Sequence, residues 1–265
     1  MSEHQFRFDD SAAYERMMGT WSRLVGDVFL GWLSPPLGLR WIDVGCGNGA
    51  FTQQLIERCA PGDVVGIDPS EAQLAFARSR CKPPLAQFFH GNAMALPFPY
   101  GKFDAAIMAL VLFFVPDPAK AVAEMARVVS PGGTVAAYAW DMLRGGSPTD
   151  PVWDGLRMMG VEQTLPPSAD ASRREVLHDL WINAGLEDVE TREITVSRTF
   201  SDYDDFLTTT RSASPALNAA VASVIDSEQL TRQIRQRLSV DADGHVTYAA
   251  RANAVKGRLP AAHKS

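Results

Sequence analysis

The hydrophobic positions between residues 40 and 140 follow two alternating patterns. Short, nearly continuous apolar runs are typical of strands buried on both faces, whereas apolar residues three or four positions apart are typical of helices. We expect strands at residues 39–44, 63–67, 86–90, 103–112 and 134–140. We expect helices at residues 51–59 and 118–129, and another that Ser70 caps and that ends at residue 80. This alternation predicts an α/β fold with a parallel, doubly wound sheet.

The pattern differs on both sides of this region. Helical spacing over residues 12–33 predicts a first helix, which Ser34-Pro35-Pro36 ends. A stretch rich in Gly, Pro, Asp and Met predicts a long connection over residues 141–170. Beyond it we expect a helix at 173–184, a strand at 190–200, a helical stretch at 201–238 and a strand at 246–255.

Three glycines follow the first expected strand, in the segment from Trp41 to Gly49, which reads WIDVGCGNG. Because glycine has no Cβ, a ligand can touch the backbone there, and the N-terminus of the next helix offers free N–H groups. The segment therefore predicts a nucleotide-like ligand. Gly45, Gly47 and Ala50 also satisfy the spacing of a dinucleotide fingerprint, which leaves NAD as one alternative.

Two acidic residues bear on the choice of ligand. Asp43 precedes the first glycine by two positions, where a carboxylate repels phosphate and suits a cationic ligand such as S-adenosylmethionine. Its alternative role is to cap a helix or brace the loop. Asp68 ends the second expected strand, where an acid accepts hydrogen bonds from the ribose hydroxyls of either ligand. Its alternative role is the N-cap of the next helix, for which Ser70 competes.

Composition excludes several classes of protein. Of the 265 residues, 46% are apolar and 21% are charged, so the chain is neither mostly disordered nor collagen-like. A formal net charge of −6 argues against nucleic acid as a partner. We expect no membrane span and no secretory signal, because apolar runs are short and the first residues are polar. Three cysteines without disulfide or zinc spacing predict a cytoplasmic location.

Four segments in order carry a resemblance to a known family: WIDVGCGNG, VVGIDPSEAQLAFAR, FFHGNAMALPFPYGKFDAAIMALVLFFVPDP and EMARVVSPGGTV. They resemble the class I S-adenosylmethionine-dependent methyltransferases, especially the group related to ubiquinone/menaquinone-biosynthesis C-methyltransferases. They span roughly residues 40–140, and the opening AAYERMMGTWSRLV resembles the N-terminal helix of a bacterial subset. The resemblance implies a Rossmann-like, seven-stranded, mostly parallel sheet in the order 3-2-1-4-5-7-6, with helical lid additions.

The resemblance also implies a cofactor, S-adenosylmethionine, and the residues that bind it. The residues around its methionine part would be Asp43, Gly45, Cys46, Gly47 and Gly49, with Asp43 reading the ammonium group. Asp68 would hold the ribose, with Pro69 beside it and Gln73 against the adenine. The adenine edge would be read by Gly91, Asn92 and Ala93.

Two further groups of residues are implied in the same way. Ala109 and Leu110 would lie under the methionine and ribose, and Tyr14, Met18 and Arg23 would close over the cofactor. The family often has Asp in place of Asn92, whose side-chain carbonyl can still accept a hydrogen bond from adenine. The alternatives are that Asn92 shapes a turn after Gly91 and that Arg23 is a solvated surface residue.

With this resemblance we interpret the chain as a single methyltransferase domain, residues 1–265. It comprises an N-terminal helical cap (1–34), a cofactor-binding core (35–140) and a substrate-side half (141–265) with a helical insertion at 201–240. The expected partner is a small methyl acceptor, apolar or aromatic, and the sequence does not decide between monomer and homodimer. The residues expected to wall its pocket, or alternatively to fill core, are Trp21, Phe113, Phe114, Trp140, Trp153, Met158, Met159, Tyr203 and Phe206.

No catalytic residue and no metal ligand is assigned from the sequence. Because a sulfonium already activates its methyl group, the protein mainly needs to align the reactants and exclude water. His90, His178, Tyr138 and Asp141 are the nearest candidates for a base, and none is singled out. An NAD-dependent oxidoreductase and a non-catalytic binding module remain as alternative functions.

Overall fold

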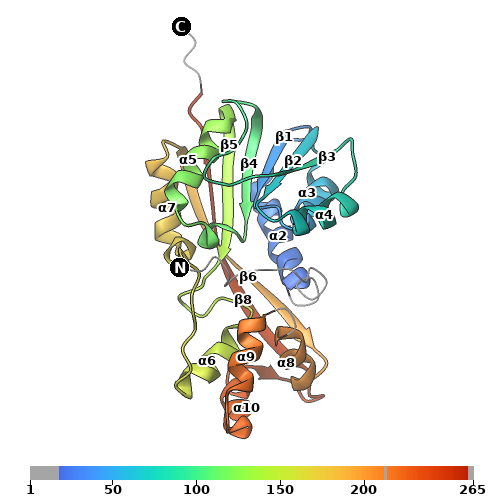
Figure 1. The fold of residues 1–265 in the computed structure, drawn as a ribbon, viewed down its shortest axis with the longest axis vertical. Coiled ribbons are helices and arrows are strands. Elements are labelled where there is room, and N and C mark those ends of the chain that lie inside the picture. Colours follow the sequence, from blue (N-terminus) through green and yellow to red (C-terminus); the bar gives the residue numbers. More distant parts are fainter. Residues whose placement is uncertain (1–17, 212–213, 262–265) are drawn as a thin grey trace.

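The computed structural model describes residues 18–211 and 214–261. A mixed sheet of eight strands forms its centre (Figure 1). In chain order the strands are β1 (Arg40–Val44), β2 (Asp63–Asp68), β3 (Ala86–His90), β4 (Phe103–Ala109), β5 (Val129–Trp140), β6 (Glu187–Phe200), β7 (Ser239–Val240) and β8 (Val246–Arg258). Strands β1 to β5 are parallel to one another, and β8 runs antiparallel to both β5 and β6.

The order of the strands is β3-β2-β1-β4-β5-β8-β6, with β7 paired to β8 off this path. This confirms the Rossmann-like order expected from the resemblance, with one correction to the number of strands. The extra strand, β7, has only two residues, which is too short to produce a pattern of alternating polarity. The strand expected seventh is therefore β8, in the expected place beside β5.

The helices are α2 (Thr20–Leu33), α3 (Ala50–Cys59), α4 (Glu71–Arg80), α5 (Pro118–Val128), α6 (Asp150–Met158), α7 (Arg174–Asn183), α8 (Tyr203–Arg211), α9 (Pro215–Ala222) and α10 (Ser227–Arg235). Two short 3₁₀ turns are η2 (Leu112–Phe114) and η3 (Ala169–Ser172). Local signals explain several starts: the Ser70 side chain accepts a hydrogen bond from the Gln73 N–H, and Asp117 caps α5 directly before Pro118.

The structure adds detail to two expectations about the second half of the chain. The connection at 141–170 contains helix α6, whose first turn carries Pro151, and the turn η3. The helical stretch expected at 201–238 contains three helices, α8, α9 and α10. It breaks at Ser214 and at Asp226, whose side chains cap the next helices by accepting hydrogen bonds from backbone N–H groups.

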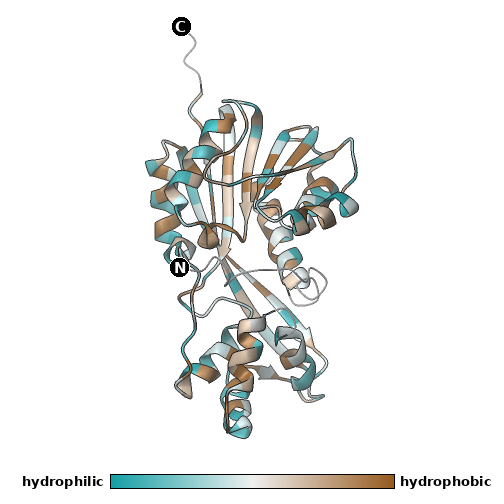
Figure 2. Cartoon of the chain, in the orientation of Figure 1, coloured by the Kyte–Doolittle hydropathy of each residue, from teal (hydrophilic) through white to brown (hydrophobic). Residues whose placement is uncertain are grey.

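Helices cover both faces of the sheet. On one face, Trp41 packs in a buried cluster with Phe29 of α2 and Leu55 of α3. On the other face, Ile42 packs with residues of α5 and α7, such as Trp181. The switch from Trp41 to Ile42 reflects the alternation of side chains along a strand. The central strands accordingly lie toward the hydrophobic end of the colour scale in Figure 2.

Strands β6 and β8 continue beyond the carboxyl end of β5 and carry a second lobe made of α6, α8, α9 and α10 (Figure 1). Residues of this lobe, including Phe206 and Ile234, belong to the same buried cluster as Trp21 of α2 and Tyr138 of β5. The apolar core is thus continuous from the sheet into the lobe. Within the described ranges, no helix has the length and apolar character that a membrane crossing requires.

Candidate functional site

The three glycines between β1 and α3 form a tight loop at the carboxyl edge of the sheet. Gly45, Gly47 and Gly49 have φ angles of 77°, 51° and 77°, a region that favours glycine. The N–H groups of Gly45 and Cys46 donate to the Ile67 carbonyl of β2, over 2.7 and 3.1 Å. The loop is therefore fixed to the end of the neighbouring strand.

The surroundings of the three glycines differ. A Cβ at Gly45 would lie 2.6 Å from the Val111 side chain, and one at Gly49 would lie 3.0 Å from the Ala77 Cα. A Cβ at Gly47 would have no neighbour within 4 Å. Gly45 and Gly49 are thus needed for packing within the protein, whereas Gly47 faces open space, where a ligand can approach the backbone.

Asp43 is buried beside this loop, with 1% of its surface exposed. Its Oδ2 accepts a hydrogen bond of 2.6 Å from the Thr52 hydroxyl of α3, and its Oδ1 has no partner in the described structure. Burial raises the pKa of Asp43 to about 7, the Thr52 hydrogen bond opposes that rise, and the nearby Asp68 adds to it. The side chain therefore connects β1 to α3 and keeps one oxygen without a protein partner.

Asp68 ends β2 next to Gly47. Its Oδ2 accepts from the Gly47 N–H at 2.9 Å, and its Oδ1 accepts from the Ser70 N–H at 2.8 Å. Because the Ser70 side chain caps α4, the alternative role of Asp68 as the N-cap is wrong. Burial raises the pKa of Asp68, while the two N–H donors and nearby His90 oppose the rise. Each carboxylate oxygen keeps a lone pair for a ligand hydroxyl.

The residues expected beside the adenine lie around the ends of β2 and β3. Pro69 and Asn92 are exposed, Gly91 and Ala93 are half-buried, and Gln73 on α4 is buried. The Gly91 N–H donates to the Asp68 carbonyl at 3.1 Å, which joins this turn to β2. Asn92 Oδ1 accepts from the Met94 N–H at 2.8 Å, so Asn92 does shape the turn after Gly91, and its side-chain NH₂ and second carbonyl lone pair remain.

The chain after β4 has an unusual backbone at the same edge. Leu110 is 8% exposed and has a φ of 61°, which is uncommon for a residue with a side chain. Its N–H donates to the Tyr138 carbonyl of β5 at 2.8 Å. This turn places Val111 against Gly45 and leaves Ala109 half-buried. The expected pair Ala109 and Leu110 is therefore brought to the glycine loop.

Of the N-terminal residues expected to close over the cofactor, the structure describes Met18 and Arg23. Met18 is buried in the same apolar cluster as α2 and α3. The Arg23 side chain is 71% exposed and points to Glu57 of α3, with 3.7 Å between Nη2 and Oε2. The structure thus fits the solvated alternative for Arg23. Tyr14 lies outside the described residues.

Three observations concern residues for which the sequence leaves the role open. Cys46 is buried, and burial raises the pKa of its thiol well above the usual value, so the thiol is not activated. His90 and His178 are both exposed. Asp141 and Trp140 end β5 in the interior, where Asp141 Oδ1 and Trp140 Nε1 have no hydrogen-bond partner in the described structure.

The residues expected to wall an acceptor pocket are mostly core residues in this structure. Buried members are Trp21, Phe113, Trp140, Trp153, Tyr203 and Phe206. Phe114 and Met159 are half-buried against the same cluster, and Met158 is 63% exposed. Trp21 stands edge-on to Tyr248 of β8, with 6.2 Å between ring centroids, and tilted to Phe200 at 6.5 Å. An aromatic region thus joins α2 to the lobe.

Sequence reasoning missed Thr52 and Asn48. Thr52 is fully buried. The sequence signal that could have identified it is a polar residue at a position that the helical pattern places among buried residues. Asn48 is 6% exposed, and its Oδ1 accepts from the Ala50 N–H at 3.1 Å, which satisfies one donor at the start of α3.

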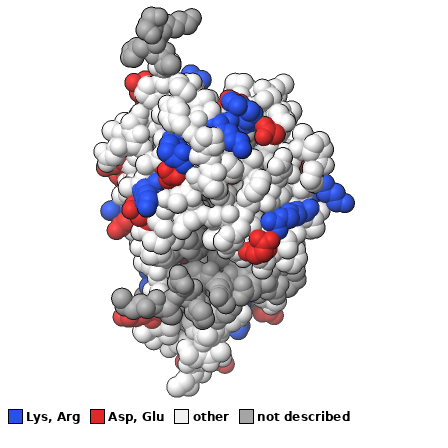
Figure 3. Space-filling view, turned by 45° about the horizontal axis from the view of Figure 1, so that its top comes forward, with Lys and Arg blue, Asp and Glu red and all other residues white. Residues whose placement is uncertain are grey.

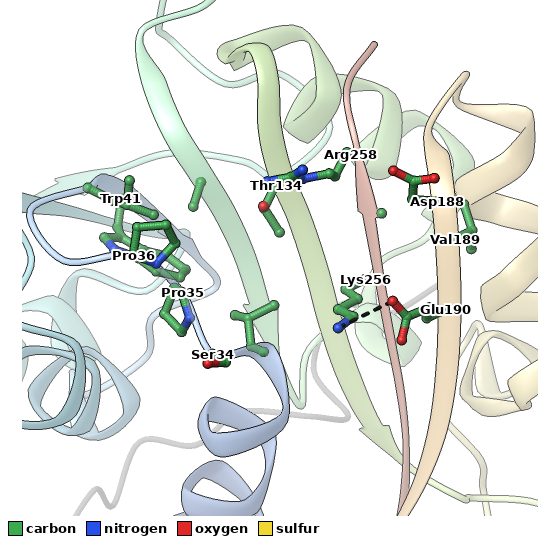
Figure 4. A pocket seen from close by; sticks show the side chains of 14 residues that line it. Ser34, Pro35, Pro36, Trp41, Thr134, Asp188, Val189, Glu190, Lys256 and Arg258 are labelled. Atoms are coloured by element: carbon green, nitrogen blue, oxygen red, sulfur yellow. Dashed lines mark ion pairs between the residues drawn. The ribbon is translucent and has the colours of Figure 1, made fainter. Parts of the chain in front are cut away.

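A groove of about 510 Å³ lies at the opposite edge of the sheet, near the amino ends of β1, β4 and β5 (Figure 4). Its lining includes Pro36, Trp41, Thr134 and Arg258, and it holds the ion pair of Lys256 with Glu190 at 3.5 Å. None of the residues expected to bind cofactor lines this groove. It is therefore separate from the glycine loop.

On the face shown in Figure 3, basic side chains lie next to acidic ones. Ion pairs in the structure include Arg40 with Asp104 at 2.7 Å and Arg127 with Glu124 at 2.6 Å. Such surface pairs contribute little to stability individually. That face carries no large patch of a single sign.

Comparisons with known proteins agree with this geometry. A family model described as a methyltransferase domain matches residues 42–137. A demethylmenaquinone methyltransferase of Shouchella clausii is 30% identical over 180 residues, which cover 60% of this chain and 74% of the relative. One of Lactococcus lactis is 31% identical over 155 residues, which cover 57% and 60%. The chain thus spans less than two thirds of the second relative.

Solved structures show the same fold at lower identity. The YcgJ protein of Bacillus subtilis superposes with a TM-score of 0.59 at 16% identity, covering 90% of this chain and 99% of its own. A phosphoethanolamine N-methyltransferase of Haemonchus contortus, in complex with S-adenosyl-L-methionine, has a TM-score of 0.59 at 18% identity and covers 97% and 58%.

The strand order and the glycine loop define a Rossmann-like methyltransferase domain. The chain belongs to the class I S-adenosylmethionine-dependent methyltransferases and is related to the menaquinone and ubiquinone group. The residues present fit that cofactor: Asp43 Oδ1 is a buried oxygen without a partner, and Gly47 leaves room for a ligand. The carboxylate of Asp43 beside the loop also disfavours the phosphates of NAD.

Proposed function

We propose that this enzyme transfers the methyl group of S-adenosylmethionine to a small apolar or aromatic acceptor. The observation that carries the proposal is the position of the glycine loop, which lies at the sheet edge where an aromatic core continues into the second lobe. The name of the related demethylmenaquinone methyltransferases supports an acceptor of the quinone class.

We assign the cofactor-binding roles as follows. Asp43 and the loop residues Gly45 to Gly49 hold the methionine part of the cofactor. The Oδ1 atom of Asp43, which has no protein partner, interacts with the ammonium group of the cofactor. Asp68 accepts hydrogen bonds from the ribose hydroxyls. The side chains of Gln73 and Asn92 and the backbone of Gly91 and Ala93 surround the adenine. Leu110 and Ala109 support the ligand from below, and Met18 lies on the side of α2.

When bound, S-adenosylmethionine supplies an electrophilic methyl group on a sulfonium. The chain's own contribution is to align the acceptor and to exclude water. The aromatic contacts of Trp21 with Phe200 and Tyr248 support an apolar environment for the acceptor next to the carboxyl edge of the sheet. We assign no general base to the reaction, and the candidates His90 and His178 are both exposed.

The proposal extends to location. The three cysteines, Cys46, Cys59 and Cys81, are free and buried. Free thiols are stable in a reducing compartment, which supports a cytoplasmic enzyme.

Two measurements test the function. Calorimetry with S-adenosylmethionine should give a binding isotherm, and the cofactor should raise the melting temperature because it binds only the folded state. Incubation with a panel of quinones and phenols should add one methyl group to at least one of them, as seen by mass spectrometry. Absence of binding at high ligand excess refutes the proposal. Binding without transfer to any acceptor favours a non-catalytic module.

A further inference from the structure

The carboxylate of Asp43 is held in an asymmetric way by the folded protein. Asp43 projects from β1 toward α3, where its Oδ2 accepts the 2.6 Å hydrogen bond from the Thr52 hydroxyl. Thr52 has no exposed surface, and Asp43 has 1%. Only one oxygen, Oδ1, is left without a protein partner in the described structure. The Thr52 bond fixes the orientation of the carboxylate group and leaves its second oxygen for a ligand.

The surroundings of Asp43 contain further acidic groups. Asp68 at the end of β2 raises the pKa of Asp43, and Asp43 in turn raises the pKa of the thiols of Cys46, in the loop, and Cys81, after α4. His90 acts on Asp68 and lowers its pKa. Beside desolvation, the groups that shift the pKa of Asp43 in the described chain are Thr52 and Asp68, and neither is a cation. A buried carboxylate in this environment is costly when ionised.

We propose that Thr52 is a positioning residue for Asp43, and that cofactor binding releases the proton that this carboxyl group holds in the free protein. The inference rests on the proposed cofactor site. In the free protein the carboxyl group of Asp43 is protonated in a large fraction of molecules at neutral pH. A cation beside Oδ1 stabilises the carboxylate, so the O–H bond breaks and the proton passes to solvent. No other bond changes.

The size of the effect follows from the pKa of about 7. At pH 7 about half of the free molecules carry the proton, so binding should release about half a proton per cofactor. Between pH 5.5 and 6.5 the ionised fraction of such a group rises about eightfold, and the affinity for S-adenosylmethionine should rise by about the same factor.

Three variants separate the two parts of the proposal. Asp43→Asn has no proton to release, so any pH dependence that persists in it comes from other groups. Thr52→Val keeps the shape of the side chain and removes the donor, which raises the pKa of Asp43 further. Thr52→Ser keeps the hydroxyl and should restore the wild-type profile.

The experiment is calorimetry with S-adenosylmethionine at pH 5.5, 6.5 and 7, in pairs of buffers with different ionisation enthalpies, which count released protons directly. We expect about half a proton at pH 7 in the wild type, close to one in Thr52→Val and clearly less than the wild-type number in Asp43→Asn. Melting curves of the free variants confirm that each is folded.

The outcomes are distinct. Cofactor binding by the wild type without proton release and with a constant affinity overturns this inference and leaves the proposed function intact. A Thr52→Val profile identical to the wild type overturns the positioning role of Thr52. No cofactor binding at all by the wild type refutes the proposed function itself.

Discussion

At the residue scale, the three glycines of the loop have different structural roles. Gly45 and Gly49 are constrained by Val111 and Ala77, whereas Gly47 faces open space beside the carboxylate of Asp68. The same φ region therefore serves packing at two positions and ligand approach at the third. This difference can be measured.

We predict that Gly49→Ala destabilises the free protein by about 2 kcal/mol or more, because a left-handed alanine is strained and its Cβ would meet the backbone of Ala77 at 3.0 Å. Gly47→Ala should cost about 1 kcal/mol, since only the strain applies. Denaturant unfolding measures both values. Calorimetry should then show that Gly47→Ala loses cofactor affinity despite its stable fold, and normal affinity in that variant would contradict our assignment.

We predict that Asp68→Ala lowers the affinity for S-adenosylmethionine by at least about tenfold, the usual effect of losing charged hydrogen bonds. The variant also removes the acceptor for the Gly47 and Ser70 N–H groups. Asp68→Asn is the matched control, because its carbonyl keeps one acceptor, and its affinity should be intermediate. Unchanged affinity in Asp68→Ala refutes the ribose assignment.

At the element scale, the sheet and its first helices were predictable because their signals are local. Strand β3 and helix α4 have the expected bounds, since apolar runs and the Ser70 cap mark them in the sequence. Helix α6 was missed because Gly and Pro dominate its surroundings, although Pro151 in its first turn is a start signal. The breaks before α9 and α10 depend on caps at Ser214 and Asp226 within one long apolar pattern.

The candidate site could be predicted only in part, for a physical reason. The glycines and Asp68 follow from strand ends that meet at one edge of a parallel sheet. The Thr52 contact with Asp43 depends on how α3 is rotated against β1, which spacing along the chain does not specify. Similarly, the long exposed side chain of Arg23 reaches Glu57, and the sequence does not decide between such partners.

We propose that the lobe and the sheet form one domain, and helix α10 offers a test. Ile234 is fully buried and meets α6, where a Cβ at Gly155 would lie 3.0 Å from its Cγ1. Ile234→Ala should cost about 2–4 kcal/mol and lower the midpoint of a single unfolding transition of the whole chain. Arg232→Ala, on the exposed side of α10, is the control and should change stability by less than about 0.5 kcal/mol. Two separate transitions would show that the lobe is an independent unit.

At the scale of the whole molecule, stability should depend on pH through buried carboxyl groups. Asp150 in α6 is 4% exposed, and burial raises its pKa to about 7, although its carboxylate accepts a hydrogen bond from the Ser147 N–H at 2.6 Å. An acid whose pKa is raised by folding binds more protons in the folded state. Its contribution to stability is therefore complete below about pH 4 and is lost as the pH rises to about 7.

We predict that Asp150→Asn gains stability relative to the wild type as the pH rises from 5 to 8, by up to a few kcal/mol. The amide carbonyl can still accept the Ser147 N–H, so the loop geometry is kept. Denaturant unfolding of both proteins without cofactor measures the difference. A difference that is the same at pH 5 and pH 8 would falsify the burial-driven rise in the pKa of Asp150.

The two longest strands, β6 with 14 residues and β8 with 13, run from the sheet into the second lobe, with one irregularity in their pairing between Glu187 and Glu190. At about 3.3 Å per residue each strand is more than 40 Å long. The pairing between the two strands extends from Glu187 and Arg258 to Phe200 and Val246. Two strands that are hydrogen-bonded to each other resist bending more than a loop between two lobes does. An acceptor should therefore enter and leave by movement of the segments attached to this frame, while the distance between the glycine loop and the lobe stays nearly constant throughout turnover.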